Sequence, residues 1–164
     1  CWIISEEGQS LLWFLFPFTG TVDIQQYVKA REKPMINHIM IGSSNIEKTR
    51  AFYTAVLGVL GAGPPFDHVN DTGQTRLFYM HNGSTFCISE PINGEPVTVA
   101  NGSTIGFTCD SPEQIQELHD VAIGNGGTSV EQPPGARESD MGAVYLCYFL
   151  DPDGHKICGF HRPS

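Results

Sequence analysis

The sequence predicts an α+β fold made of two βαβββ modules related by a pseudo-two-fold axis. The first observation is an internal repeat, in which residues 35–61 return as residues 101–127 at an offset of 66 positions. The second is that each copy reads as an alternating apolar strand, a polar helix cap, an amphipathic helix and a glycine-rich exit. Two half-domains related by an axis share one cleft, so we expect the functional site there.

The first module is expected to span residues 35–92. The β-branched, alternating segment 35–42 predicts its opening strand. Asn45 is a good N-cap for a helix that runs to about Leu57. Three further strands, separated by turn sequences, are expected at residues 62–69, 75–81 and 85–90.

The second module is expected to span residues 101–163, after a Gly-, Pro- and Asn-rich linker at 91–102. Ser111 caps its helix, Pro112 occupies the first helical position, and Gln114 completes a capping box. The remaining expected elements are strands at 103–109, 128–131, 143–150 and 156–160, a loop at 132–142 and a tight turn at 151–154.

Residues 35–164 therefore predict a single domain, and residues 1–34 an N-terminal extension of uncertain status. Its apolar run at 11–18 is too short to cross a bilayer. No basic segment precedes that run and no small-residue cleavage site follows it, which argues against a secretory signal. The segment is an extension, a remnant of cloning or upstream sequence, or else a genuine helix that packs on the domain or on a partner subunit.

The composition indicates a cytoplasmic protein that binds neither nucleic acid nor membranes. Nine basic and eighteen acidic residues give a formal net charge of −9, whereas binding to phosphates requires concentrated Lys and Arg. Five cysteines are scattered through the predicted strands without CxxC spacing, which is typical of reduced cysteines in the cytosol.

Two motifs resemble those of the vicinal oxygen chelate superfamily, which contains glyoxalase I, bleomycin-resistance proteins and extradiol dioxygenases. HIMIGSSNIEKTRAFYTAVLGVLG at 38–61 is similar to the opening strand and helix of that superfamily, and FLDPDGHKICGF at 149–160 to its final turn and strand. The resemblance covers about residues 35–163. It implies curved mixed sheets that enclose a cleft, and a homodimer.

The resemblance also implies one divalent metal ion in the cleft, such as Zn, Ni, Mn or Fe, acting as a Lewis acid. Carried over by position, the ligand sites are His38, Cys87, Thr104 and Cys158. The superfamily commonly has His or Glu at each site, so this chain departs from the pattern at three of them. In the glyoxalase I reaction the glutamates at these sites also act as proton shuttles. This chain has no glutamate at any of the four sites, so no catalytic residue is assigned.

Three interpretations of these four positions remain open. In the first, His38, Cys87 and Cys158 hold zinc, and Thr104 or water completes a tetrahedron. In the second, the cysteines are small apolar fillers in a cleft that binds a ligand and no metal. In the third, the alignment is out of register. A disulfide between Cys87 and Cys158 is a further alternative, although a cytosolic setting argues against it.

Four residues are candidates for contacts with a small-molecule ligand. Arg76 is the basic residue best suited to an anionic group, while Phe78, Tyr145 and Tyr148 are strand aromatics that suit an apolar cleft wall. His155, beside the last strand, is expected on the outer side of its sheet. Asp151 and Asp153 are explained by the geometry of the turn.

Three functions of different classes follow. The first is a glyoxalase I-like lyase or isomerase that acts on a small oxygenated substrate through a metal. The second is a metal-free binding protein that sequesters a hydrophobic or drug-like ligand, as bleomycin-resistance proteins do. The third is a ligand sensor or structural dimer without catalysis.

Overall fold

The repeat is visible in the structure as two modules with the same order of elements. A computed structural model describes residues 35–138 and 142–163, so the predicted N-terminal extension lies outside the described residues. Both modules belong to one compact unit of the chain. In the part of the chain that is described, no helix has both the length and the apolar character needed to cross a membrane.

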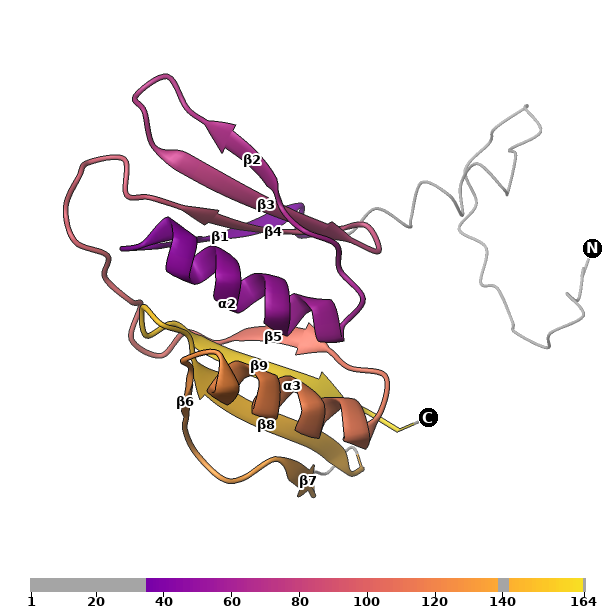
Figure 1. The fold of residues 1–164 in the computed structure, drawn as a ribbon. Coiled ribbons are helices and arrows are strands. Elements are labelled where there is room, and N and C mark those ends of the chain that lie inside the picture. Colours follow the sequence, from indigo (N-terminus) through magenta and orange to yellow (C-terminus); the bar gives the residue numbers. More distant parts are fainter. Residues whose placement is uncertain (1–34, 139–141, 164) are drawn as a thin grey trace, which may run out of the picture. The chain divides into compact units, whose positions relative to one another are not determined.

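The first module is a four-stranded mixed sheet with one helix (Figure 1). Its elements are β1 (His38–Gly42), α2 (Ile46–Val59), β2 (Phe66–Val69), β3 (Thr75–His81) and β4 (Ser84–Ser89). The strands lie in the order β1-β4-β3-β2, with β1 parallel to β4 and the other pairs antiparallel. Asn45 caps α2 as predicted, since its side chain accepts a hydrogen bond from the backbone N–H of Lys48.

The second module repeats this order and adds one strand. Its elements are β5 (Ile105–Thr108), α3 (Pro112–Gly124), β6 (Thr128–Ser129), β7 (Gly135–Arg137), β8 (Val144–Leu150) and β9 (Lys156–His161). The order is β5-β9-β8-β6, with β5 parallel to β9. The prediction of an unbroken loop at 132–142 was wrong, because β7 pairs with the part of β8 that β6 leaves free and satisfies its backbone groups.

The two sheets share a register as well as a strand order. Met40 lies opposite Cys87 in the first sheet, and Gly106, 66 positions after Met40, lies opposite Cys158 in the second. Cys87 and Cys158 therefore occupy equivalent places in the two modules, as the resemblance implied.

Each helix covers one face of its own sheet. In the first module Tyr53 of α2 is fully buried, with its ring centroid 4.9 Å from that of Phe86. In the second module Gly159 allows α3 to approach closely. A Cβ at this position would lie 2.8 Å from Sγ of Cys147 and 2.9 Å from Cδ2 of Leu118, so no larger residue fits without a shift.

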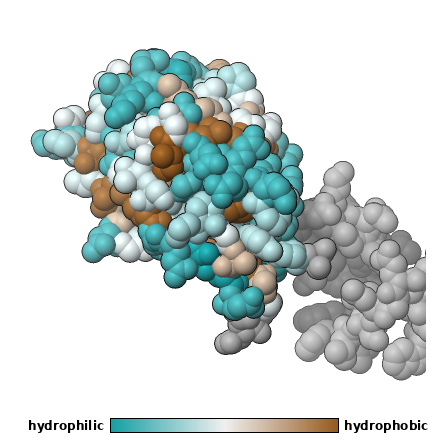
Figure 2. Space-filling view, turned by 60° about the horizontal axis from the view of Figure 1, so that its bottom comes forward, coloured by the Kyte–Doolittle hydropathy of each residue, from teal (hydrophilic) through white to brown (hydrophobic). Residues whose placement is uncertain are grey.

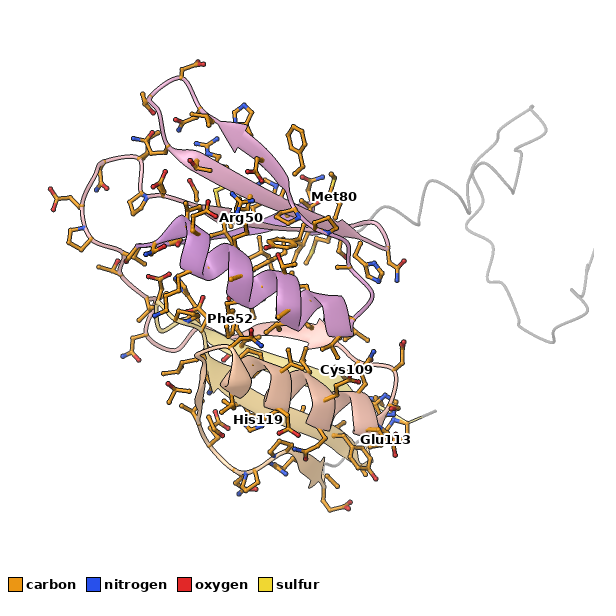
Figure 3. All side chains as sticks on the ribbon, viewed as in Figure 1. Arg50, Phe52, Met80, Cys109, Glu113 and His119 are labelled. Carbon is orange, nitrogen blue, oxygen red and sulfur yellow. The ribbon has the colours of Figure 1, made fainter. Side chains whose placement is uncertain are left out.

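Aromatic side chains join the two modules. Phe52 lies on the side of α2 away from the first sheet (Figure 3), and its ring centroid is 6.2 Å from that of Phe149 in β8. Phe86 and Phe107 meet edge to face at 5.3 Å. These contacts make one continuous core from the two halves.

The turn between β8 and β9 is a polar joint between the modules. Asp151 is buried and accepts hydrogen bonds from the Tyr53 hydroxyl (2.8 Å) and from the backbone N–H groups of Asp153 and His155. Asp153 in turn accepts one from the backbone N–H of Ser44 at 3.0 Å. Turn geometry alone therefore does not account for these two carboxylates.

His155 belongs to the same joint, and the prediction that it lies on the outer side of the sheet was wrong. Its side chain is buried, and Nε2 donates a hydrogen bond to the carbonyl oxygen of Gly42 at 2.9 Å. The residue precedes β9 and belongs to a turn that folds onto the first module. The alternation of faces along the strand therefore does not decide where it points.

Apolar residues also reach the surface. On the side of the molecule that Figure 2 presents, they form small patches among polar residues. The described residues with exposed large apolar side chains include several from the first module, among them Met40, Phe66 and Met80.

Candidate functional site

The first sheet has one face that α2 does not cover, and we call it the open face. Because successive residues of a strand point to opposite sides, the strand register places side chains in cross-strand rows on this face. The rows are His68–Arg76–Ser89–Gly42, Phe66–Phe78–Cys87–Met40 and Met80–Thr85–His38. Val97 of the segment between the modules packs against the Gly42 end of the first row. The predicted ligand contacts Arg76 and Phe78 are thus neighbours on the open face.

Arg76 is half-buried, and one of its nitrogen atoms lacks a partner among the described residues. Its Nε is the only buried side-chain nitrogen or oxygen atom of the described residues without a hydrogen-bond partner. Burial raises the pKa of the Cys87 thiol, and the nearby charge of Arg76 lowers it in part. The guanidinium therefore lies close to Cys87 in the neighbouring row.

The second sheet presents an equivalent face with different contents. Tyr148 lies opposite Cys158, and the Lys156 ammonium lies 4.7 Å from the centroid of the Tyr148 ring. Lys156 also forms an ion pair with Glu131. The fourth predicted contact, Tyr145, lies on the helix side of β8, where it packs against the core beside Cys147 and Phe149. The structure therefore does not bring all four predicted ligand contacts together.

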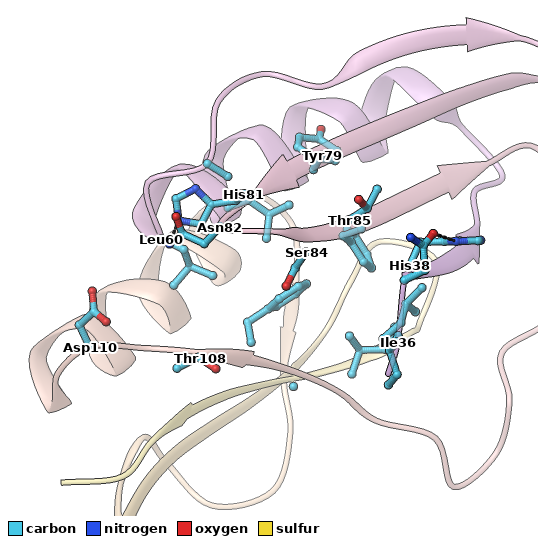
Figure 4. A pocket seen from close by; sticks show the side chains of 18 of the residues that line it. Ile36, His38, Leu60, Tyr79, His81, Asn82, Ser84, Thr85, Thr108 and Asp110 are labelled. Atoms are coloured by element: carbon cyan, nitrogen blue, oxygen red, sulfur yellow. Dashed lines mark hydrogen bonds between the residues drawn. The ribbon is translucent and has the colours of Figure 1, made fainter. Parts of the chain in front are cut away.

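A pocket of about 560 Å³ opens between the two modules. It is lined by residues 36–39, the end of α2, the β3–β4 hairpin, β5 and the start of α3 (Figure 4). His38 and Thr85 belong both to this lining and to the open face, so the two surfaces are continuous. The contribution of β5, whose Gly106 and Phe107 line the pocket, was not predicted from the sequence, because it depends on how the two modules pack against each other.

The pocket contains polar groups but no pair of carboxylates. Among the residues that the structure describes, Asp110 is the only acidic one in the lining. Gln114 is held in place, because its Nε2 donates to the carbonyl oxygen of Val59 and its Oε1 accepts from the backbone N–H of Asp110. His38 is hydrogen-bonded through Nδ1 to the side chain of Asn37 at 3.0 Å.

The predicted metal ligands do not form a fitting set. Within the described ranges no three His, Cys, Asp or Glu side chains are grouped so that they could hold a metal ion. His38 lines the pocket, whereas Cys87, Thr104 and Cys158 are not among its lining residues, and Thr104 precedes β5. We therefore derive no chemical step through a metal.

Two of the predicted ligands, Cys87 and Cys158, are both buried and free, so the alternative of a disulfide between them is wrong. Burial raises the pKa of both thiols; the charge of Arg76 lowers that of Cys87 in part, and a hydrogen bond with Tyr148 lowers that of Cys158 in part.

Comparisons with known proteins identify the family. Residues 35–158 match the family model of the Glyoxalase/Bleomycin resistance protein/Dioxygenase superfamily. The chain belongs to this superfamily. This chain has the two-module fold that the resemblance implied, with a mixed sheet in each half.

Solved structures of other superfamily members resemble this one. A glyoxalase/bleomycin resistance protein from Albidiferax ferrireducens T118 is 47% identical, with a TM-score of 0.72, covering 79% of this chain and all of that one. A glyoxalase-related enzyme from Fulvimarina pelagi shares the fold at 20% identity, with a TM-score of 0.59, covering 79% of this chain and 88% of that one. The search among curated proteins found no match.

Proposed function

We propose that this superfamily member is a binding protein that holds a small organic molecule in the pocket between its modules, without a metal ion. The observation that carries the proposal is the pocket itself, with a volume of about 560 Å³. This volume is in the range of ligand sites in proteins, and its mixture of apolar walls and a few polar groups is typical of them.

The arrangement favours binding over proton-transfer chemistry. The glyoxalase I reaction uses carboxylates as proton shuttles, and among the described residues the pocket lining offers one carboxylate, Asp110, just before the second module's helix. The lining also contains the imidazoles of His38 and His81, and neither forms a hydrogen bond with a carboxylate of the described residues. We therefore assign no catalytic residue.

A neutral aromatic probe tests the proposal. We expect 1-naphthol to bind the purified protein saturably in a fluorescence titration. Gly106→Leu should weaken this binding at least tenfold, because Gly106 lines the pocket and has open space where a side chain would project. Gly124→Leu is the matched control, since Gly124 also faces open space but does not line the pocket.

Equal affinity in the wild type and Gly106→Leu would place the ligand elsewhere and overturn the proposal. No saturable binding in the wild type would do the same. The glyoxalase I-like lyase is the competing function, and elemental analysis decides it. We expect no stoichiometric Zn, Ni, Mn or Fe. A stoichiometric metal that is lost in His38→Ala would support the lyase instead.

We make two further proposals, which concern the oligomeric state and the cellular location of the protein. We propose a cytoplasmic homodimer, on the resemblance to the superfamily and on the reduced state of Cys87, Cys109, Cys147 and Cys158. Sedimentation velocity at several protein concentrations tests the dimer, and a single monomeric species at every concentration would contradict it.

A further inference from the structure

We infer that the ligand carries an oxyanion, such as a carboxylate or a phosphoryl group, that Arg76 binds on the open face of the first sheet, and that its aromatic body lies on Phe78 toward the pocket. This inference rests on the proposed function and names the class of ligand. Three features of the open face support it: the missing hydrogen-bond partner of Arg76 Nε among the described residues, the absence of acidic residues from the three rows, and the apolar side chains beside Arg76.

Arg76 differs from the other described arginines in lacking a partner. Arg50 pairs with Glu47 and with Asp67, and its bond to Asp67 uses both terminal nitrogens. Arg137 donates to two backbone carbonyl oxygens, and Arg162 lies over the ring of Phe160 at 5.8 Å. By contrast, the buried Nε of Arg76 has no acceptor among the described residues, and a guanidinium accommodates oxyanions well because of its fork of donors.

The charge of the open face is opposite to that of the whole chain. The protein carries a formal net charge of −9, yet the three rows of the open face contain no Asp or Glu. They contain one arginine and two histidines, His38 and His68. An anion that approaches the protein therefore meets a cationic site on an otherwise acidic molecule.

The surface beside Arg76 suits an aromatic body. Phe78 sits next to Arg76 on this face, and its ring centroid is 6.4 Å from that of Phe66 and 6.3 Å from that of His68. Phe66 is 60% exposed, Met80 64% and Met40 40%, and they flank the half-buried Phe78 and the buried Cys87 at the centre of the face. Exposed apolar side chains gathered on one face suit contact with an apolar ligand body.

The spacing of the rows links the anion site to the pocket. From the row of Arg76 to the row of His38 the strand advances four residues, which is roughly 13 Å at the usual rise of a β-strand. His38 and Thr85 at the far end already line the pocket. A ligand headgroup bound by Arg76 therefore lies at the opposite end of the open face from the pocket, and an aromatic body on Phe78 lies between the two.

Three probes that share a naphthalene ring test the inference. They are 1-naphthol, which is neutral near pH 7, 1-naphthoate, which carries a carboxylate, and 1-naphthyl phosphate. We expect at least one anion to bind about tenfold or more tightly than 1-naphthol. A hydrogen bond to a charged group stabilises a complex more than a neutral one does, and the difference corresponds to about a tenfold change in the dissociation constant. The anion with the larger preference identifies the type of headgroup.

Two matched variants locate the effect. Arg76→Gln should abolish the preference for the anion, measured as the ratio of its dissociation constant to that of 1-naphthol. Arg50→Gln removes the same charge from the other side of the first sheet, where Arg50 pairs with Asp67, and should leave the ratio unchanged. Thermal unfolding of both variants confirms that they fold.

The outcomes separate this inference from the proposed function. If 1-naphthol binds and neither anion is preferred, or if the preference survives Arg76→Gln, the inference is overturned and the proposed function stands. If none of the probes binds, both fall. If Arg76→Gln alters the sedimentation of the protein and has no effect on the ratio, the open face is an interface with a second copy, which also overturns the inference.

Discussion

The two modules share their strand order and register but differ in what they present on the faces away from their helices. In the first sheet the buried Nε of Arg76 has no hydrogen-bond partner among the described residues, and Phe66, Met80 and Met40 on the same face are exposed. In the second sheet Lys156 pairs with Glu131 and lies over the ring of Tyr148. The repeat thus fixes the course of the backbone, while each face is set by its own side chains.

The register makes this comparison specific. Arg76 lies opposite Ser89, and the equivalent pair in the second sheet is Leu146 opposite Phe160. A cation in one half therefore stands where the other half has an apolar residue. The second module in turn supplies the buried turn that joins the halves, whose Asp151 binds Tyr53. One half provides the candidate anion site and the other provides the joint.

Asp151→Ala should give the largest effect, because it removes the joint from the second module. The change deletes three hydrogen bonds and leaves the hydroxyl of the fully buried Tyr53 without an acceptor. We expect the free energy of unfolding to fall by roughly 3–4 kcal/mol, measured by urea denaturation. A loss below about 1 kcal/mol would contradict the role of Asp151 as the joint.

Asp151→Asn serves as the control and exposes the ionisation of this group. Burial raises the pKa of the Asp151 carboxyl above its ordinary value of 3.8, although the hydrogen bond from Tyr53 lowers it in part. The native state then holds the proton more tightly than the unfolded state. The stability of the wild type relative to Asp151→Asn should fall as the pH rises from 3.8 through the raised pKa, and a rise over this range would contradict the prediction.

Gly159→Ala should give the next largest effect, again in the second module. The added Cβ would meet Cys147 and Leu118 at less than 3 Å, so we expect a loss of about 1–3 kcal/mol in urea denaturation. Gly106→Ala is the control on the neighbouring strand, because nothing lies within 4 Å of its Cβ position. Equal losses in the two variants would show that α3 does not depend on this close approach.

Arg76→Leu should have a smaller effect of the opposite sign. The change removes a buried donor without a partner and introduces the residue that the second module has at the equivalent place. We expect the free energy of unfolding to rise by about 1 kcal/mol, because an unsatisfied buried donor costs about 1–3 kcal/mol. A clear loss of stability would indicate that Arg76 serves the fold of the first module rather than a ligand.

Lys156→Met should give the smallest effect. The ion pair with Glu131 is partly exposed on both sides, and pairs of this kind stabilise proteins by less than about 1 kcal/mol. We expect a loss of about 0.5 kcal/mol or less in the same urea denaturation. A larger loss would mean that the ion pair between Lys156 and Glu131 contributes strongly to the stability of the second module. The two sheets would then differ more than expected, since Arg76 in the first sheet forms no ion pair among the described residues.

Much of the fold could be predicted from local patterns. Asn45 and Ser111 were predicted as helix caps from their residue types, and both accept the expected hydrogen bonds. The equivalence of Cys87 and Cys158 followed from the family resemblance, since the two cysteines are 71 positions apart and not 66. The strand β7 could not be predicted, because its pairing depends on the free edge of β8 rather than on the sequence of residues 135–137.

The candidate site was predicted less completely. Arg76 and Phe78 were each predicted as ligand contacts, and the structure places them on one face, because residues two apart on a strand share a face. Tyr145 was not placed correctly with respect to the core, since alternation tells which residues share a face but not which face meets the helix. The contribution of β5 to the pocket required knowledge of how the two modules pack.

The sequence by itself determined the two-module α+β fold and the superfamily, because both depend on periodicity, caps and motifs that are local along the chain. Only the tertiary structure decided that His155 and Asp151 join the modules and that Arg76 lacks a partner. Hydrogen bonds and burial depend on which distant segments meet in space, and local sequence patterns do not specify those encounters.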